Sequence, residues 1–224
     1  MSGLGESLDE LGHAVLPGLV GAADCAVLAA RWDDEGAFRK RVVMQQHGFG
    51  RGEYRYFSYP LPPLVQALRV SLYAELAPIA NRWRGELRLP GDFPATLDAY
   101  LEKCHSQGQT KPTPLVLRYE RGDFNCLHQD LYGPLVFPLQ ATVLLSDPAR
   151  DFAGGEFLLV EQRPRAQSRG EVVPLGRGDA VVFPVRERPR RGVRGFHRVQ
   201  MRHGVSRIRS GLRFSLGIIF HDAG

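Results

Sequence analysis

Five polar residues in the second half of the chain have types and spacings suited to a metal centre beside an anion site. They are His128 and Asp130, then His203, then Arg213 and Ser215. Side chains two apart in a β-strand point the same way, so a strand here presents the first histidine and the carboxylate together. Two imidazoles and one carboxylate are typical of non-haem Fe(II) sites with open coordination positions. The sequence therefore predicts a metal site made by His128, Asp130 and His203.

The third ligand has a rival, because His197 lies only six residues before His203. We favour His203, since the ten-residue interval to Arg213 allows one strand to carry the ligand and the next to carry the guanidinium, with a turn between them. Cys126, two residues before His128, could share its strand face. Because a small thiol usually behaves as a hydrophobe, we expect Cys126 to be a packing residue.

Arg213 has a planar guanidinium fork suited to bidentate binding of a carboxylate, and Ser215 can donate a further hydrogen bond from the same strand face. Alternation through 213–220 puts small and polar residues on one face and bulky apolar ones on the other. The first face holds Arg213, Ser215, Gly217 and Ile219, and the second holds Phe214, Leu216, Ile218 and Phe220. We expect the first face to line a cavity.

Helical patterns dominate residues 1–110. Apolar residues recur at helical spacing over 22–32, over 63–88 with an interruption near Pro78, and over 95–105. Between the first two lies a Gly- and Tyr-rich stretch, 45–57, that lacks either period and predicts a mobile loop. It could close as a lid, but we favour anchoring of Tyr54, Tyr56 and Phe57 on the core.

From Pro114 onward the pattern changes to short strands separated by Gly, Pro and Asp clusters, at 115–120, 140–145, 156–161, 179–184 and 213–220. The predicted fold is mainly β, a double-stranded β-helix or jelly roll with an N-terminal helical layer. Residues 1–110 would form the helical support and 111–224 the jelly-roll core, together in one compact domain.

The composition of the chain gives an expectation about the cellular location of the protein. The chain has 224 residues and three scattered cysteines, which argues against a disulfide framework. No apolar run approaches a membrane span, and the acidic start, with Glu6, Asp9 and Glu10, lacks the basic residues of a signal peptide. We expect a soluble, cytoplasmic protein without membrane contact.

The net charge of +5 is unevenly distributed. Segment 163–213 contains fourteen arginines, no lysine and only three acidic residues, Glu171, Asp179 and Glu187. Such a segment can attract nucleic acid by releasing counterions from phosphates. Alternatively, its arginines pair with acidic residues elsewhere in the fold, and the sequence leaves both possibilities open.

Several ordered blocks of this chain resemble those of Fe(II)/2-oxoglutarate-dependent dioxygenases, especially the prolyl 4-hydroxylase type. The blocks are 117–130 with its HxD motif, 140–146, Gly154-Gly155-Glu156, 178–183, and His203 followed by Arg213 and Ser215. They cover roughly half of the chain, and they are specific in combination although HxD alone is weak. The Arg-rich segment and the ending 218–223 resemble a bacterial oxygenase group labelled as acting on damaged DNA.

The resemblance implies Fe(II) on His128, Asp130 and His203, with 2-oxoglutarate and dioxygen as cosubstrates. Arg213 and Ser215 would bind the distal carboxylate of 2-oxoglutarate, while Tyr119 and Thr142 either help to bind it or only pack. The reaction would hydroxylate a C–H bond and release succinate and carbon dioxide.

The substrate is left open between three classes. Oxidative demethylation of alkylated nucleic acid fits the Arg-rich 163–213 segment and the damaged-DNA label. A prolyl hydroxylase-like action on a protein side chain, or action on a small molecule, is the enzymatic alternative, although prolyl hydroxylases commonly use Lys where this chain has Arg213. A ligand-binding jelly roll is the non-enzymatic alternative, and the complete metal set and anion anchor argue against it.

Overall fold

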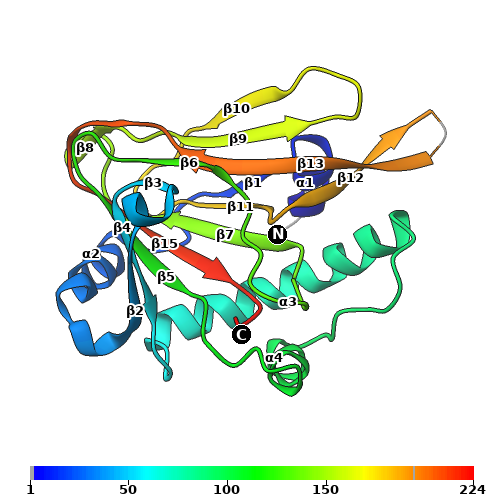
Figure 1. Ribbon diagram of the computed structural model, residues 1–224, viewed down its shortest axis with the longest axis horizontal. Helices are drawn as coiled ribbons and strands as arrows, with labels where there is room; N and C mark the ends of the chain where they lie inside the picture. Colours follow the sequence, from blue (N-terminus) through cyan, green and yellow to red (C-terminus); the bar gives the residue numbers. More distant parts are fainter. Residues whose placement is uncertain (1–2, 194) are drawn as a thin grey trace.

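Two antiparallel β-sheets face each other, and helices cover the outer face of one of them (Figure 1). The computed structural model describes residues 3–193 and 195–224. The strands are β1 (Ala14–Leu16), β2 (Phe38–Val43), β3 (Gly50–Arg51), β4 (Glu53–Phe57), β5 (Leu115–Tyr119), β6 (Phe124–His128), β7 (Leu139–Leu144), β8 (Phe152–Gly154), β9 (Phe157–Gln162), β10 (Arg169–Val173), β11 (Ala180–Pro184), β12 (Glu187–Gly192), β13 (Gly195–Val205), β14 (Ile208–Gly211) and β15 (Arg213–Ile219). The larger sheet has the order β1-β11-β7-β15-β5-β4-β2. The smaller has the order β10-β9-β13-β6-β3, with β12 paired to β13, while β14 pairs separately with β8. The predicted mainly β, jelly-roll class is confirmed.

The helices are α1 (Leu4–Glu10), α2 (Ala22–Ala30), α3 (Pro63–Glu86) and α4 (Leu97–Ser106), with three 3-10 turns, η1 (Arg31–Asp33), η2 (Glu35–Ala37) and η3 (Met44–His47). One hydrophobic cluster joins buried residues of all four α-helices to the outward faces of β5, β7, β11 and β15. None of the helices in the described residues has both the length and the hydrophobicity of a membrane span.

Helix α3 is continuous through Pro78, where the sequence predicted an interruption. It begins with Pro63 at its first turn, where a missing N–H costs nothing. Leu72, Leu76 and Ala80 recur every four residues on its buried face, on both sides of the exposed proline. Packing against the sheet therefore offsets the hydrogen bond that Pro78 cannot make.

The segment 45–57 was predicted as a mobile loop, and that prediction is wrong for most of its length. Residues 44–47 form η3, and residues 50–57 contribute β3 and β4, of which β4 pairs with both β2 and β5. Tyr56 and Phe57 are buried, so the favoured anchoring on the core is confirmed. The alternation of Tyr54 and Tyr56 with Glu53 and Arg55 is a strand pattern, but the flanking glycines obscured it.

Residues 1–110 contain strands as well as the expected helices. Strand β1 pairs with β11, β3 pairs with β6, and β4 pairs with β5, so the N-terminal half contributes to both sheets. The sequence did not indicate these strands because β1 and β3 are only three and two residues long. Such short runs show no measurable period. The five strands predicted after residue 114 correspond to β5, β7, β9, β11 and β15.

A buried ion pair ties α3 to the end of the chain. The Arg69 guanidinium donates to Asp222 Oδ1 at 2.8 Å and to the carbonyl of Ile219 at 2.9 Å, and both charged side chains are fully buried. Asp222 also accepts hydrogen bonds from Tyr59, and it lies 2.8 Å from Nε2 of His105. Asp222 is thus a structural residue.

We predict that Arg69→Met destabilises the protein by about 3–5 kcal/mol, because removal of one partner leaves the Asp222 carboxylate buried without its counter-ion. The free energy of unfolding in urea measures this. Arg82 forms exposed ion pairs with Asp9 and Glu86, so Arg82→Met is the matched control and should cost less than about 1 kcal/mol. Equal losses in the two variants would contradict the structural role of the buried pair.

Candidate metal and cosubstrate site

The inner faces of the two sheets enclose a cavity of about 290 Å³. Strands β5, β7 and β15 of the larger sheet line one side, and β6, β9 and β13 of the smaller sheet line the other. All seven residues predicted for the site line this cavity, namely Tyr119, His128, Asp130, Thr142, His203, Arg213 and Ser215. The fold therefore brings together positions that lie up to 96 residues apart in the sequence.

His128 and His203 are direct cross-strand neighbours. Strands β6 and β13 are antiparallel, and their register pairs these two residues. Directly opposite side chains on one face of such a pair lie within contact distance. The imidazole centroids are 4.1 Å apart, so strand pairing alone places two ligand side chains together.

Asp130 follows the end of β6 instead of lying on it, so the prediction of a strand through the whole HxD motif was wrong. The intervening Gln129 sets the position of the carboxylate. Its side-chain amide donates to the carbonyl oxygens of Met201, at 2.8 Å, and Arg186, at 3.1 Å. These bonds hold the loop against β13, and Asp130 turns toward the histidines.

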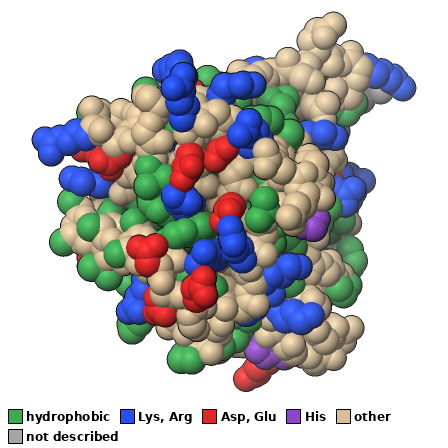
Figure 2. All heavy atoms as spheres, turned by 60° about the vertical axis from the view of Figure 1, so that its left-hand side comes forward, with side chains coloured by type: hydrophobic (Ala, Val, Ile, Leu, Met, Phe, Trp, Pro, Cys, Tyr) green, Lys and Arg blue, Asp and Glu red, His purple; other side chains and the backbone are tan. Residues whose placement is uncertain are grey.

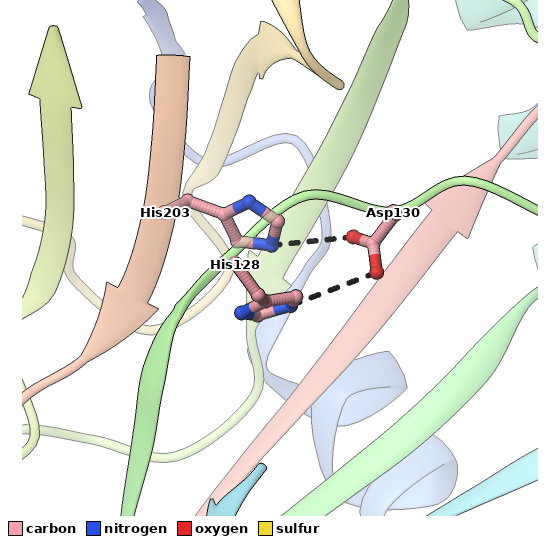
Figure 3. Close-up of side chains that lie close together, drawn as sticks. All are labelled: His128, Asp130 and His203. Carbon is pink, nitrogen blue, oxygen red and sulfur yellow. Dashed lines mark ion pairs between the residues drawn. The ribbon is translucent and has the colours of Figure 1, made fainter. Parts of the chain in front are cut away.

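The three predicted ligands converge in the structure (Figure 3). Nε2 of His203 lies 3.2 Å from Oδ2 of Asp130, and Nε2 of His128 lies 3.6 Å from Oδ1. One ligand atom from each residue lies within 4.8 Å of the other two, a separation that a single metal ion can bridge.

Hydrogen bonds orient two of these groups. Nδ1 of His128 lies 2.8 Å from the carbonyl of Cys126, which keeps the proton on Nδ1 and leaves the Nε2 lone pair for a metal. The Tyr132 hydroxyl donates to Oδ1 of Asp130 at 2.7 Å. Tyr132 and Gln129 were not anticipated, because their roles depend on the shape of the loop and not on a recognisable motif.

The ionisation of the site suits a cation. Burial acts to raise the pKa of the Asp130 carboxyl, but the imidazoles of His128 and His203 hold it well below its ordinary value. Burial lowers the pKa of His203, and the charge of His128 lowers it further. For His128 burial also acts to lower the pKa, but the Asp130 carboxylate outweighs it and the net shift is upward. A metal ion bound at the Nε2 atoms would compete with protons for the same lone pairs.

Arg213 is the residue predicted to bind the carboxylate of an acidic ligand. Its side chain is only 1% exposed, and its Nη1 lies 3.2 Å from the Ser215 hydroxyl. Nε has no hydrogen-bond partner, and no carboxylate lies within ion-pair distance among residues 3–193 and 195–224. Burial lowers the pKa of the guanidinium, but an arginine stays charged in proteins. A buried cation without a counter-ion is unfavourable, so it favours an acidic ligand in this cavity.

Tyr119 and Thr142 also face the cavity. Tyr119 is fully buried, its hydroxyl accepts a hydrogen bond from Asn125 at 3.3 Å, and its ring lies 5.7 Å from the Arg213 guanidinium carbon. Register pairs Thr142 with Gly217 of β15, at the centre of the cavity floor. Both are placed where a ligand of Arg213 can reach them.

The predicted two-faced character of β15 is confirmed. Arg213, Ser215, Gly217 and Ile219 line the cavity. Leu216, Ile218 and Phe220 belong to the main hydrophobic cluster, and Phe214 packs against it. Gly155 shapes the end of the cavity near Arg213, since a Cβ at this position would lie 2.9 Å from Cδ of Arg213 and 2.3 Å from Ile208.

Two sequence-based alternatives are resolved by position. His197 is exposed and pairs with Arg190 in the β12–β13 hairpin, so it lies outside the group of convergent ligands. Cys126 is also outside that group, but it is exposed, so the expected packing role is wrong. The neighbouring Leu127 is exposed as well, so this part of β6 is open to solvent.

The donor set fits Fe(II). Two neutral imidazole nitrogens and a carboxylate make up the ligand type of non-haem iron oxygenases, which leaves positions for a cosubstrate and dioxygen. In the described part of the chain, no other group of three His, Cys, Asp or Glu side chains converges in this way.

Comparison with known proteins agrees with this arrangement. Residues 52–223 match the Oxygenase-NA family, described as an oxygenase catalysing oxidative methylation of damaged DNA. An uncharacterized protein of Mycobacterium tuberculosis (strain ATCC 25618 / H37Rv) is 52% identical over 190 residues, which cover 83% of this chain and 82% of that protein.

Solved structures show the same fold at low sequence identity. A Pseudomonas putida prolyl-4-hydroxylase has a TM-score of 0.58 and 16% identity, over 99% of this chain and 98% of that one. A 2OG-Fe(II) oxygenase family oxidoreductase from Burkholderia pseudomallei has a TM-score of 0.51 and 17% identity, over 99% and 91%.

We predict that His203→Ala or Asp130→Ala lowers the affinity for Mn(II) or Fe(II) by more than about 100-fold, since each removes one ligand from a three-residue set. Calorimetric titration under anaerobic conditions measures this. His197→Ala is the matched control and should bind metal like the wild type. If His197→Ala loses the metal and His203→Ala keeps it, the assignment of the third ligand is wrong.

Proposed function

The chain belongs to the Oxygenase-NA family, and from this membership we propose that it is an Fe(II)- and 2-oxoglutarate-dependent dioxygenase that hydroxylates a C–H bond. One observation carries the proposal. A convergent His-Asp-His set and a buried guanidinium without a carboxylate partner among the described residues line the same cavity. The first fits a metal ion and the second fits the distal carboxylate of a short diacid.

The residues of the chain have distinct roles in this proposal. His128, Asp130 and His203 would hold the iron, and Gln129 and Tyr132 would keep the carboxylate in position through the hydrogen bonds described above. With 2-oxoglutarate and dioxygen, the iron would supply the oxidising power that inserts one oxygen atom into a C–H bond and the other into succinate, with loss of carbon dioxide.

The cosubstrate end of the cavity is formed by the larger sheet. Arg213 would bind the distal carboxylate as a planar fork, and the Ser215 hydroxyl would add a hydrogen bond. Tyr119 stays protonated, since burial raises the pKa of its hydroxyl, so it can donate as well as accept. Apolar side chains such as Leu117 and Val205 line the same space and limit the access of water.

The proposed substrate is an N-alkylated base of nucleic acid. Hydroxylation of an N-methyl carbon gives an N-hydroxymethyl group, which loses formaldehyde and restores the N–H of the base. The description of the family concerns damaged DNA, which supports this class. A protein side chain or a small molecule is the alternative substrate, and the experiment below separates these classes.

The distribution of arginines also supports a polyanionic partner. Several exposed arginines of segment 163–213 have no carboxylate within ion-pair distance among the residues the structure describes, including Arg177, Arg186, Arg191, Arg202 and Arg207. Others form ion pairs, as the alternative reading expected: Arg163, Arg188 and Arg190 all contact Glu161. Arg194 lies outside the described residues.

Two of these arginines, Arg191 and Arg202, lie on strands β12 and β13. Figure 2 shows a face where basic and acidic side chains are interspersed. The β12–β13 hairpin, which projects from the body in Figure 1, instead carries Arg191 near its tip. Arg202 follows on the outward side of β13, next to the cavity-facing His203. This surface would hold phosphates while a base enters the cavity.

We predict that Arg213→Met weakens binding of 2-oxoglutarate by about 100-fold or more, because the charge-assisted bond to the distal carboxylate is lost. Metal affinity should be unchanged, since Arg213 is not a ligand. Displacement of 2-oxoglutarate from the Mn(II) protein measures the first and titration of Mn(II) the second. Unchanged 2-oxoglutarate affinity would rule out the assigned anchor.

We predict that N-methylated oligonucleotides, and not peptide or metabolite panels, stimulate succinate production and release formaldehyde. Arg191→Glu with Arg202→Glu should weaken oligonucleotide binding, and the slope of log affinity against log salt should fall by about one for each phosphate contact removed. Glu substitution of Arg169, which already pairs with Glu171, is the control. Stimulation by peptides alone would replace the nucleic-acid substrate with a protein one.

A further inference from the structure

Gln140 is a buried side chain of the cavity that the proposed chemistry does not use. It lies on β7, lines the cavity and is 3% exposed. Its Nε2 has no hydrogen-bond partner within residues 3–193 and 195–224. A buried amide donor left without a partner is costly, and nearly all such groups in folded proteins are satisfied by protein, water or ligand.

Strand register places Gln140 at the end of the cavity away from Arg213. Gln140 pairs with Ile219 of β15, whereas Thr142 pairs with Gly217 and Leu144 pairs with Ser215. Six residues of strand separate Ile219 from Arg213, which corresponds to about 20 Å along β15. A short diacid held by Arg213 would not extend over that length, so the proposed cosubstrate leaves the Gln140 amide without a partner.

The same register places Gln140 beside the metal ligands. Its partner on the other neighbouring strand is Phe183 of β11. The Phe183 ring lies 4.7 Å from the His203 imidazole. Gln140 is therefore one cross-strand neighbour away from a residue that contacts His203, one of the predicted metal ligands.

Aromatic and aliphatic side chains enclose this end of the cavity. Ile219 and Leu115 form a buried cluster against which Tyr54 and Tyr132 pack, and all four line the cavity. The Tyr132 hydroxyl is already engaged with Asp130. The surroundings are thus mostly aromatic and aliphatic, and the Gln140 Nε2 is a buried donor without a partner in the described part of the chain.

We propose that this end of the cavity is a nucleobase subsite and that Gln140 binds the hydrogen-bonding edge of the base. A primary amide presents a donor and an acceptor side by side, which matches a ring nitrogen next to an exocyclic amino or carbonyl group. Aromatic walls suit a planar ring, since stacking adds to affinity. The inference rests on the proposed function, because it names how the substrate of that same site is recognised.

The test uses protein loaded with Mn(II) and N-oxalylglycine, which permits binding without turnover. N-methylated adenosine and cytidine are the nucleoside probes, and an N-acetyl dipeptide amide is the competing amide probe. Gln140→Leu removes the donor and acceptor at similar volume, and Gln140→Met is a second variant in case the first does not fold. Gln162→Leu, at an exposed position of β9, is the matched control.

We predict that the wild type and Gln162→Leu bind at least one nucleoside and that both Gln140 variants bind it about 10- to 100-fold more weakly. Affinities for Mn(II) and N-oxalylglycine should be the same in all four proteins. Formaldehyde release from oligonucleotides should follow as a rise in KM with little change in uncoupled succinate production.

Different failures have different meanings. If Mn(II) and N-oxalylglycine bind but nucleoside affinity is absent or independent of Gln140, the subsite is wrong and the dioxygenase proposal stands. If the dipeptide amide binds in a Gln140-dependent way and the nucleosides do not, the base assignment is overturned in favour of a peptide substrate. If the wild type binds neither Mn(II) nor N-oxalylglycine, the proposed function itself fails.

Discussion

The register of β13 between β6 and β9 is the constraint on which the site depends. It places His203 directly opposite His128 on one side and opposite Leu159 on the other. Because side chains alternate, a shift of one residue would turn His203 away from the cavity and bring Arg202 in. The irregularity between His203 and Val205 fixes where regular pairing with β6 ends. The predicted metal site therefore depends on strand alignment. The HxD motif supplies His128 and Asp130, and the pairing of β13 with β6 brings His203 to them.

Arg213 shows a second constraint, which acts on stability as well as on binding. A guanidinium with 1% exposure must be compensated, yet its close neighbours are the Ser215 hydroxyl and the rings of Tyr119 and Phe152. These neutral groups lower the cost of burial without neutralising the charge. An acidic ligand that binds only the folded protein supplies the missing charge, and it stabilises the fold by mass action. A cosubstrate bound as proposed would in this sense be part of the electrostatic balance of the cavity.

Much of this site was predictable from the sequence, because two histidines, a carboxylate and an arginine at these spacings have few common roles other than binding a metal ion and an acidic ligand. The alternation through β15 correctly separated cavity residues from core residues, and the interval between His203 and Arg213 favoured His203, which converges with His128 and Asp130, over His197, which does not. Other features depend on tertiary contacts that no local pattern encodes. Pro78 stays inside a helix because packing on both sides holds it, and Gln129 acts through backbone carbonyls of distant strands. Strand β3 was missed for a related reason, since its pairing partner β6 lies about seventy residues further along the chain.

The two ends of the cavity along β15 differ in their side chains, and this bears on which atom of a substrate the proposed reaction would oxidise. A diacid bound at Arg213 would occupy one end, and the aromatic-lined end near Gln140 lies about six residues, or about 20 Å, further along the strand. The predicted ligands His128 and His203 belong to the opposite sheet, and the His203 ring lies 4.7 Å from Phe183, the cross-strand partner of Gln140. In the proposed subsite, a planar base held by its edge at Gln140 would present a ring substituent toward Asp130 and His203. Attack on such a substituent is what oxidative removal of an N-methyl group requires, so the polarity of the fold and the chemistry proposed for it agree.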